Sequence, residues 1–283
     1  MIVTVALLVP MTALWLYSVR ARDVSIVDIA WGPAFLVVTA AATSQGAGPR
    51  AALLLGMVGL WALRLGGYLY LRNHGRPEDS RYAAMRARIP GFVWKSLFIV
   101  FWLQAALVLL VSTPVRWGVA NRDPIDVVTL FGVALWGVGL TFEAVGDLQL
   151  SRFKADSGNA GKVMDQGLWR YTRHPNYFGD FCVWWGLWLA SGQWWAFFGP
   201  VVMSWLLLRV SGVSLLERTI VDRRPAYRAY ITRTSAFFPW PPRPEASTAV
   251  VNVDGAPDDE ARRPRSGGGQ GSTGRVDGGL GQS

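Results

Sequence analysis

Seven long apolar runs, separated by short polar loops, are the feature that most restricts how this chain can fold. The runs span roughly 1–19, 24–43, 51–71, 92–113, 125–148, 176–191 and 194–216. Most are close to the length of about 20 residues that a helix needs to cross the hydrocarbon core of a bilayer. Because 51% of the residues are hydrophobic and 15 are Trp, the composition also favours a membrane protein over a soluble one. The sequence therefore predicts an all-α, polytopic membrane protein with about seven transmembrane helices.

The basic residues alternate between the loops on the two sides of these predicted spans. They are concentrated at Arg20 and Arg22, in 72–95, in 152–173 and in the stretch from Arg218 onward. By the positive-inside rule, this asymmetry predicts an outer N-terminus and a cytoplasmic C-terminus, as for an integral protein of a bacterial inner membrane. The same pattern assigns the net charge of +9 to membrane topology and not to nucleic-acid binding.

The sequence lacks the patterns of several other kinds of site. Cys182 is the single cysteine, so neither a disulfide framework nor a thiolate metal site is expected. His74 and His174 lie in basic loops, and two such residues do not predict a metal site. No Gly-x-Gly-x-x-Gly segment follows a strand pattern, so the sequence does not support a soluble-type nucleotide-binding fold. The N-terminus lacks the features of a cleaved signal peptide and is expected to be a retained first span.

The last part of the chain differs in composition from the apolar spans. Residues 217–242 are basic and aromatic and predict a helix on the cytoplasmic face. From Pro244 onward, Gly, Ser, Pro and charged residues dominate, which is typical of disorder. We therefore expect a membrane domain at 1–243 and a disordered tail at 244–283. No internal repeat is apparent, which disfavours an inverted-repeat transporter, and no obligate protein partner is inferred.

Six ionisable residues fall within the predicted spans, where an isolated charge would cost about 2.5–3.5 kcal/mol on insertion scales. They are Asp28, Arg64, Glu143, Asp147, Asp180 and Arg209. On the predicted topology all of them lie in the cytoplasmic half of the membrane. This distribution favours a shared, water-accessible cavity that opens to the cytoplasm. The alternative is that these residues pair structurally or extend toward the membrane interface.

The segment 167–180, GLWRYTRHPNYFGD, joins a basic aromatic loop to the start of the sixth span. Pro175 suits the first turn of a helix, where its missing N–H is not needed. Asn176 and Asp180 then lie four residues apart, so they share one helix face. An ionisable residue at the start of a membrane span indicates a functional site.

Glu143 and Asp147 have the same four-residue spacing on the fifth span. Two such pairs, on neighbouring spans, offer hydrogen-bond partners for ribose hydroxyls and for a carboxamide. The lysines and arginines of 152–173 offer donors to phosphates. Together these residues predict a dinucleotide site that does not use a Rossmann fold.

The same motifs resemble those of a known family. They are similar to bacterial DUF1295 proteins in the segments DIAWG (28–32), WALRLGGYLYLRNHGRPEDSRY (61–82), FEAVGDLQLSRFKAD (142–156), GLWRYTRHPNYFGD (167–180) and AYRAYITRTSAFFPW (226–240). These proteins belong to the steroid 5-alpha-reductase-like membrane reductases, and the likeness covers about 15–240. It implies a seven-helix reductase that holds NADPH in a cytoplasm-facing cavity. Its substrate would be an enone lipid, steroid-like or otherwise flat and apolar, whose carbon–carbon double bond is reduced.

By this resemblance, residues from several parts of the chain would hold the cofactor. Asp147, Asn176 and Asp180 would bind the riboses and the adenine-distal part of NADPH. The residues that would surround its phosphates are Asn73, Arg76, Lys154, Lys162, Tyr171 and Arg173. The pocket would be completed by Arg64, Glu143, Tyr177 and Arg209.

The resemblance also implies where the carbonyl of the substrate would be polarised. The steroid enzymes use a glutamate on the second span and a tyrosine on the third. Here the second span offers Asp28, and Trp61 occupies the position that aligns with the tyrosine. Because an indole cannot donate in the same way, Tyr68, a turn or two away, is the expected donor. Asp28 and Tyr68 are therefore the predicted catalytic residues.

Two other functions are compatible with the sequence. The RHPxY segment and an acidic-plus-YxxY stretch near the C-terminus also occur in membrane methyltransferases of the isoprenylcysteine carboxyl type, which use S-adenosylmethionine. The basic loop 152–173 suits a phosphate-rich dinucleotide better than a phosphate-free sulfonium donor, so the reductase is preferred. A lipid-binding or transport protein would need only the cavity, and not so many phosphate donors on one face.

Overall fold

The computed structural model describes residues 1–210, 220 and 226–244. Over these residues the chain is helical, and its one β-type contact is an isolated bridge between Thr172 and Ser235. The long helices are α1 (Ile2–Ala21), α2 (Ile26–Thr43), α3 (Ala51–Asn73), α8 (Val127–Ala155) and α9 (Pro175–Ser191). A continuous segment joins α5 (Phe92–Ser96), the π-helical η1 (Leu97–Trp102) and α6 (Leu103–Val111). Shorter elements are α4 (Ser80–Arg88), α7 (Thr113–Gly118), α10 (Phe198–Trp205), the π-helical η5 (Leu206–Val210) and α12 (Tyr227–Arg233).

Five helices in the described part of the chain are long and apolar enough to cross a membrane. They are α1, α2, α3, the segment Phe92–Val111 and α8. The prediction of an all-α polytopic membrane protein is thus confirmed. Helix α9 has 17 residues, and the apolar helix Trp194–Val210 is also short. At a rise of about 1.5 Å per residue, 17 residues reach only about 26 Å, so the predicted count of seven spans, and the orientation of the termini, stay predictions.

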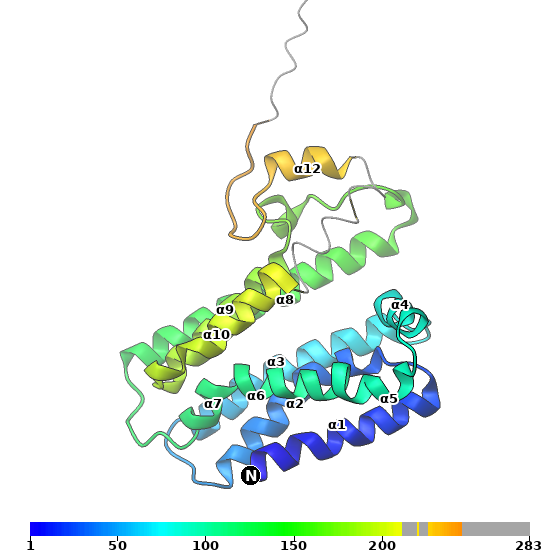
Figure 1. The fold of residues 1–283 in the computed structure, drawn as a ribbon. Coiled ribbons are helices and arrows are strands. Elements are labelled where there is room, and N and C mark those ends of the chain that lie inside the picture. The colour runs from blue at the N-terminus through cyan, green and yellow to red at the C-terminus, as the bar shows by residue number, and fades with distance from the viewer. Residues whose placement is uncertain (211–219, 221–225, 245–283) are drawn as a thin grey trace, which may run out of the picture. The chain divides into compact units, whose positions relative to one another are not determined.

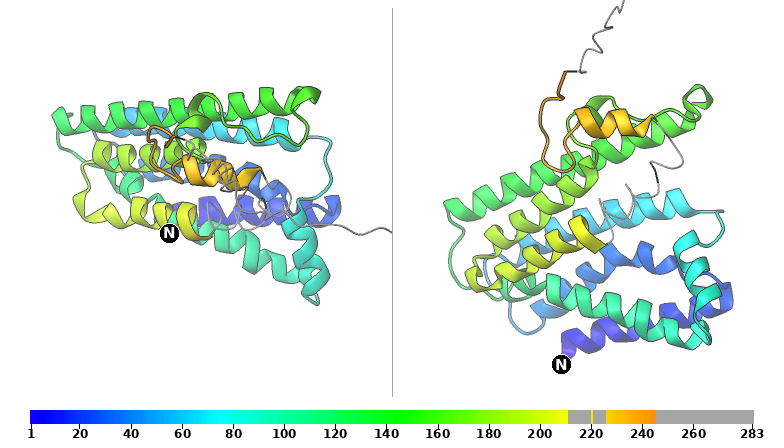
Figure 2. Two further views of the ribbon diagram at one scale, coloured as in Figure 1. Left: turned by 90° about the horizontal axis from the view of Figure 1, so that it is seen from above. Right: turned by 45° about the horizontal axis from the view of Figure 1, so that its top comes forward.

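Helices α8 and α9 lie side by side (Figures 1 and 2), because glycines allow their backbones to touch. A Cβ atom added to Gly139 would lie only 2.5 Å from the carbonyl oxygen of Gly179. A Cβ atom added to Gly179 would in turn lie 2.7 Å from Cγ of Glu143. Small residues are enriched where membrane helices approach this closely. The contact therefore holds the polar face of α8 against the start of α9.

A cluster of aromatic side chains joins α2, α3 and α9. The ring centroid of Phe35 is 4.5 Å from that of Trp184 and 5.5 Å from that of Trp61, and the two tryptophans are 5.4 Å apart. All three side chains are fully buried. Tilted and edge-to-face pairs of this kind contribute about 0.5–1.5 kcal/mol each beyond the burial of area. The cluster fixes the three helices relative to one another around the polar residues described below.

Helix α4 is held in place by the loop that precedes it. Gly75 and Gly91, on either side of 76–90, both adopt a left-handed conformation, with φ of 72° and 70°, which glycine reaches without steric cost. The carboxylate of Glu78 accepts hydrogen bonds from the backbone N–H of Val24 at 2.8 Å and from the guanidinium of Arg86 at 2.7 Å. The loop is thereby tied to the start of α2, and α4 is placed beside it.

The helix predicted at 217–242 is shorter than expected in the part that the structure describes. Helix α12 ends at Arg233, and residues 235–244 are not helical. Prolines at 239, 241, 242 and 244 prevent the helix from continuing to 242, since proline cannot donate to the helical hydrogen-bond ladder. Residues 211–219, 221–225 and 245–283 lie outside the described residues, and with them the rest of this predicted helix, the end of the predicted seventh span and the predicted tail.

Candidate functional site

A cavity of about 380 Å³ lies among the helices that carry most of the charged residues of the spans. Its polar lining consists of Asp28, Arg64, Tyr68, Arg72, Arg81, Tyr82, Gln104, Glu143, Asp147, Asn176, Tyr177 and Asp180. Its apolar lining consists of Trp31, Leu65, Leu69, Leu107, Met203, Leu206, Leu207 and Val210. The volume falls within the range of about 300–1,000 Å³ that is typical of ligand sites. One cavity thus combines a polar and an apolar surface.

Arg64 is the centre of a buried ion-pair cluster between α3 and α8. Its Nη1 lies 2.5 Å from Oε2 of Glu143, and its Nη2 pairs with Oδ2 of Asp147. The indole N–H of Trp61 donates to Oε1 of Glu143 at 3.3 Å. The side chains of Glu143 and Asp147 are only 3% and 7% exposed, so these contacts replace the water that the carboxylates lose. The guanidinium of Arg64 is therefore committed to two carboxylates and is not available to a phosphate.

The start of α9 adds two polar groups to this cluster. The helix begins at Pro175, as predicted, with the proline in its first turn. The Asn176 amide donates to Oδ1 of Asp147 at 3.4 Å. Asp180 lies near enough to Glu143 for the two carboxyl groups to interact electrostatically. The indole N–H of Trp184 lies near this carboxylate, but no donor among the described residues makes a hydrogen bond of ordinary geometry with its buried Oδ1. Since buried acceptors are nearly always paired, this oxygen indicates a place for a hydrogen-bond donor of a ligand.

A second polar group of the cavity joins α2, α4 and α6. The phenol of Tyr82 donates to Oδ1 of Asp28 at 2.7 Å, and Nη2 of Arg81 donates to Oδ2 of the same carboxylate at 2.8 Å. The amide Nε2 of Gln104 is 3.5 Å from the Tyr82 hydroxyl oxygen. Burial and the neighbouring Asp28 carboxylate both raise the pKa of Tyr82, so the phenol stays protonated at neutral pH. Asp28 is consequently occupied by two side chains of α4.

Tyr68 and Arg72 extend the polar lining along α3. The ring of Tyr68 has the guanidinium of Arg64 at 5.9 Å from its centroid and that of Arg72 at 5.8 Å. Arg72 also donates from Nε to Oδ1 of Asn73 at 3.0 Å. Among the described residues that line the cavity, Arg72 is the arginine without a carboxylate partner, since Arg64 and Arg81 are both ion-paired. Its charge is therefore available to an anionic ligand.

More than half of the residues predicted for the site lie together in this cavity. They are Asp28, Arg64, Tyr68, Glu143, Asp147, Asn176, Tyr177 and Asp180. Arg209 is not among them. Its side chain is exposed, although Leu207 and Val210 on the same segment line the cavity. The structure therefore brings the predicted acid and amide pairs together but leaves Arg209 outside.

The residues predicted to surround phosphates do not line the cavity. They are Asn73, Arg76, Lys154, Lys162, Tyr171 and Arg173. Arg76 and Lys162 are exposed in loops, and Tyr171 is 44% exposed. Arg173 is instead buried, and its Nη1 donates to the carbonyl oxygens of Ile231 at 3.0 Å and Thr234 at 2.5 Å. It holds the C-terminal end of α12 against the loop before α9, which the sequence pattern did not indicate.

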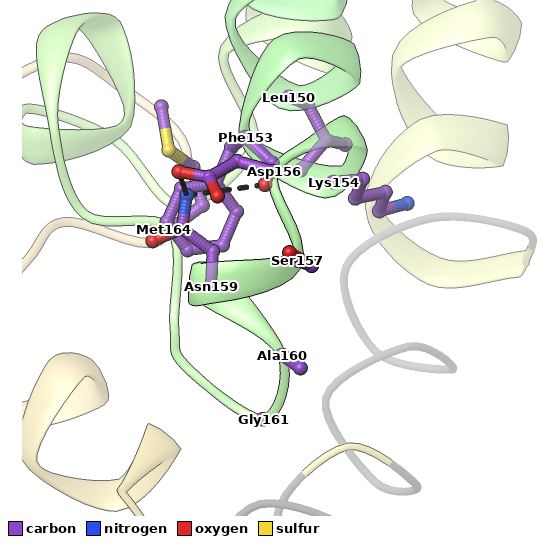
Figure 3. A pocket seen from close by; sticks show the side chains of 9 residues that line it. All are labelled: Leu150, Phe153, Lys154, Asp156, Ser157, Asn159, Ala160, Gly161 and Met164. Carbon is purple, nitrogen blue, oxygen red and sulfur yellow. Dashed lines mark hydrogen bonds between the residues drawn. The ribbon is translucent and has the colours of Figure 1, made fainter.

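Lys154 lines a separate pocket of about 160 Å³ at the end of α8 (Figure 3). The side chain of Asn159 donates there to Oδ2 of Asp156 and to the carbonyl oxygen of Phe153, both at 3.2 Å. These polar groups therefore satisfy one another within the loop. The pocket shares no lining residue with the cavity.

Four polar residues of the cavity were missed by reasoning from the sequence: Arg72, Arg81, Tyr82 and Gln104. Gln104 had a detectable signal, because it is an amide in the middle of the apolar run 92–113. Arg81 and Tyr82 belong to the short helix α4 between two predicted spans, and nothing in their spacing predicts a contact with Asp28 more than fifty residues earlier. Arg72 was counted as a topological charge.

Comparison with known proteins places these residues in a family. A family model described as "Protein of unknown function (DUF1295)" matches residues 14–234. The chain belongs to the DUF1295 family. All residues that line the cavity fall within the matched range, so the cavity is part of the family's domain.

One relative is an uncharacterized protein, C594.04c, of Schizosaccharomyces pombe. It is 24% identical over 214 residues, which cover 64% of this chain and 60% of the yeast protein. The chain therefore matches less than two thirds of the length of that relative. No solved structure matches the chain.

Proposed function

We propose that this DUF1295 protein is an NADPH-dependent membrane reductase that acts on the carbon–carbon double bond of an enone lipid. The observation that carries the proposal is that one cavity holds two different polar groups. One is the buried cluster of Arg64, Glu143, Asp147 and Asp180, and the other is the phenol of Tyr82 held by Asp28. The first group suits a polar cofactor, and the second suits a carbonyl oxygen.

The residues of the first group fit the non-phosphate parts of a dinucleotide. Oδ1 of Asp180, which accepts no hydrogen bond of ordinary geometry among the described residues, is a buried acceptor for the amide of a nicotinamide or for a ribose hydroxyl. Asp147 on α8 and Asn176 on α9 are hydrogen-bonded to each other and line the same cavity as Asp180. Arg72 offers the guanidinium that would contact a phosphate. When bound, NADPH would supply a hydride to the substrate.

Tyr82 fits the role of the group that meets the carbonyl oxygen of the substrate better than Tyr68 does. Its phenol is buried and stays protonated, and it is fixed by Asp28 and Gln104. When a carbonyl binds, the single phenol hydrogen would turn from Asp28 to the carbonyl oxygen, where it would stabilise the negative charge that develops on an enolate. Tyr68 lies between two guanidinium groups, and in the part of the chain that the structure describes no carboxylate is hydrogen-bonded to it. Asp28 would act as a positioning residue, because both of its oxygens are already engaged.

The apolar lining supports a lipid substrate. Trp31, Leu107, Met203 and Leu206 come from three different parts of the chain and line the same cavity as the phenol. Burial of flat hydrocarbon against such side chains stabilises binding by about 25 cal/mol per Å² of apolar area removed from water. Hydride transfer would then take place away from bulk water.

The test is NADPH oxidation by the detergent-purified protein with an apolar cyclic enone. Tyr82→Phe removes the proposed donor and keeps the ring, and we expect kcat to fall by about 10²–10³-fold. Tyr68→Phe is the matched control on α3 and should change kcat only a few-fold. A large loss in Tyr68→Phe with little change in Tyr82→Phe would reverse the assignment. No oxidation of NADPH with any enone by the wild-type protein would remove the proposal.

One observation favours a second candidate, methyl transfer from S-adenosylmethionine. Among the described residues, four carboxylates but only three guanidinium groups line the cavity. The carboxylates belong to Asp28, Glu143, Asp147 and Asp180, and the guanidinium groups belong to Arg64, Arg72 and Arg81. An excess of negative charge suits a sulfonium cation. At about 100 times its dissociation constant a ligand stabilises a protein by about 2.7 kcal/mol, so thermal shifts with each ligand alone separate the two candidates.

A further inference from the structure

Tyr177, in the first turn of α9, presents its hydroxyl to the cavity. The residue lines the cavity, and its phenol is influenced electrostatically by Arg72, Arg81, Asp147 and Asp180. All four of these charged side chains line the same cavity, and they come from both of its polar groups. The hydroxyl therefore lies among the charged groups of the cavity and not on the outer surface of α9.

The hydrogen of this hydroxyl is not committed to another side chain. Among the described residues the hydroxyl of Tyr177 forms no hydrogen bond, and its oxygen keeps accessible surface. Tyr82 differs, because its single hydrogen is directed to Oδ1 of Asp28 at 2.7 Å. The ring of Tyr177 is nevertheless fixed, since it is stacked on His174 with a centroid distance of 5.3 Å and an interplanar angle of 4°. A fixed ring with a free hydroxyl hydrogen can donate to a ligand without breaking another bond.

The proposed reaction requires a second proton donor besides Tyr82. When the β-carbon of the enone accepts a hydride, with oxidation of NADPH, the electrons of the double bond move to the carbonyl oxygen and an enolate forms. A C–H bond must then form at the α-carbon with a proton, while the enolate electrons restore the carbonyl. A phenol has one hydrogen, so Tyr82 cannot hold the enolate oxygen and protonate the α-carbon at the same time.

We propose that Tyr177 is the acid that delivers the proton to the α-carbon. This inference rests on the proposed function, because it takes enone reduction as the reaction. The O–H bond of Tyr177 breaks as the C–H bond forms, and the phenolate that remains takes a proton from water. Transfer in this direction is favourable, because a ketone enolate is a stronger base than a phenolate. The positive charges of Arg72 and Arg81 stabilise the phenolate while it exists.

The test follows the reduction of testosterone in D₂O by the full chain in detergent, with the protein in excess. Its α-carbon, C4, then receives deuterium, and NMR of the product shows on which face. We expect a single face with the wild-type protein. In Tyr177→Phe, which keeps the stacked ring, kcat should fall by about 10²–10⁴-fold, and deuterium should enter from both faces, because water protonates the enolate. In Tyr82→Phe, kcat should also fall, but the single face should be kept.

Binding measurements distinguish a proton donor from a residue that only holds a ligand. The dissociation constants of NADPH and of testosterone are measured by quenching of the fluorescence of the 15 tryptophans. Both should be unchanged in Tyr177→Phe. A variant that binds NADPH weakly but keeps the single face would make Tyr177 a cofactor contact and overturn the inference. Because the face is read on product made by folded protein, it decides the matter even if the variant melts early.

The remaining outcomes separate this inference from the proposed function. Unchanged kcat and an unchanged face in Tyr177→Phe would overturn the role of Tyr177 and leave the reductase proposal standing. Loss of the single face in Tyr68→Phe instead would assign the proton to Tyr68 and also overturn the inference. If the wild-type protein oxidises NADPH neither with testosterone nor with another apolar cyclic enone, the proposed function fails, and this inference fails with it.

Discussion

Replacing Asp180 by alanine should weaken the binding of NADPH without lowering the stability of the fold. Oδ1 of Asp180 is buried and, among the described residues, accepts no hydrogen bond of ordinary geometry, although the Trp184 indole lies near the carboxylate. A buried acceptor left unpaired costs about 1–3 kcal/mol, so its removal should leave the melting temperature unchanged or raise it. If a ligand donates to this carboxylate, the lost charge-assisted bond is worth about 1.5–3 kcal/mol, or about 10–150-fold in affinity.

Glu143→Ala is the matched comparison, because Glu143 is buried in the same cluster but is fully engaged. It bonds both Arg64 and Trp61, and breaking a buried ion pair costs about 3–5 kcal/mol. This variant should therefore melt early. Asp180→Asn keeps an acceptor oxygen and should retain most of the affinity. The assay measures the melting temperature and the dissociation constant of NADPH on the same preparations. An Asp180→Ala protein that melts early and binds NADPH normally would refute the reasoning.

Three further predictions concern other parts of the structure. Arg72→Gln should weaken NADPH binding about 10–150-fold, since Arg72 lines the cavity without a carboxylate partner among the described residues. Arg76→Gln, at a position that does not line the cavity, should leave the affinity unchanged. Titration of both variants with NADPH checks this. Burial opposes ionisation of Glu78, but Arg86 and the N–H of Val24 outweigh it and lower its pKa. The ionised Glu78 therefore stabilises the fold above its unfolded pKa of about 4.3, and this stabilisation is lost as the pH falls through the pKa of the folded state. On acidification, the melting temperature should fall less in Glu78→Gln than in the wild-type protein. Gly139→Val should destabilise the protein by about 1–3 kcal/mol or more, because its Cβ would lie 2.5 Å from the Gly179 oxygen, whereas Gly137→Val, with nothing within 4 Å of its Cβ, should not lower the melting temperature.

The helices and the central acid pairs could be predicted because local rules determine them. Long apolar runs require helices in a bilayer, where every backbone N–H and C=O must be bonded internally. The four-residue spacings of Glu143 with Asp147 and of Asn176 with Asp180 placed each pair on one helix face. Charges within a span are expensive unless they meet a partner, which is why Arg64 could be assigned to the same cavity.

The functions of the loop residues could not be predicted, because they depend on contacts between distant segments. Arg173 had the composition of a phosphate donor, but its guanidinium bonds backbone carbonyls about sixty residues later. Tyr82 is the better candidate donor than Tyr68 because α4 places its hydroxyl next to Asp28. Helix periodicity does not predict how a segment between two spans packs against them. Arg209 stands on a π-helical segment, where the usual assignment of residues to helix faces does not apply.

The backbone contact between α8 and α9 restricts substitutions at the positions that form it, but not at the lipid-facing positions of α8. Because Gly139 touches Gly179 directly, no side chain acts as a spacer between the two helices at that point. Leu130, Phe131 and Val138 on α8 are exposed, and they can be replaced by other apolar residues that suit a bilayer of different thickness or fluidity. Such replacements would leave the distance between Glu143 and Asp180 as it is. The same chemistry could therefore be carried into very different membranes with little change in the site itself.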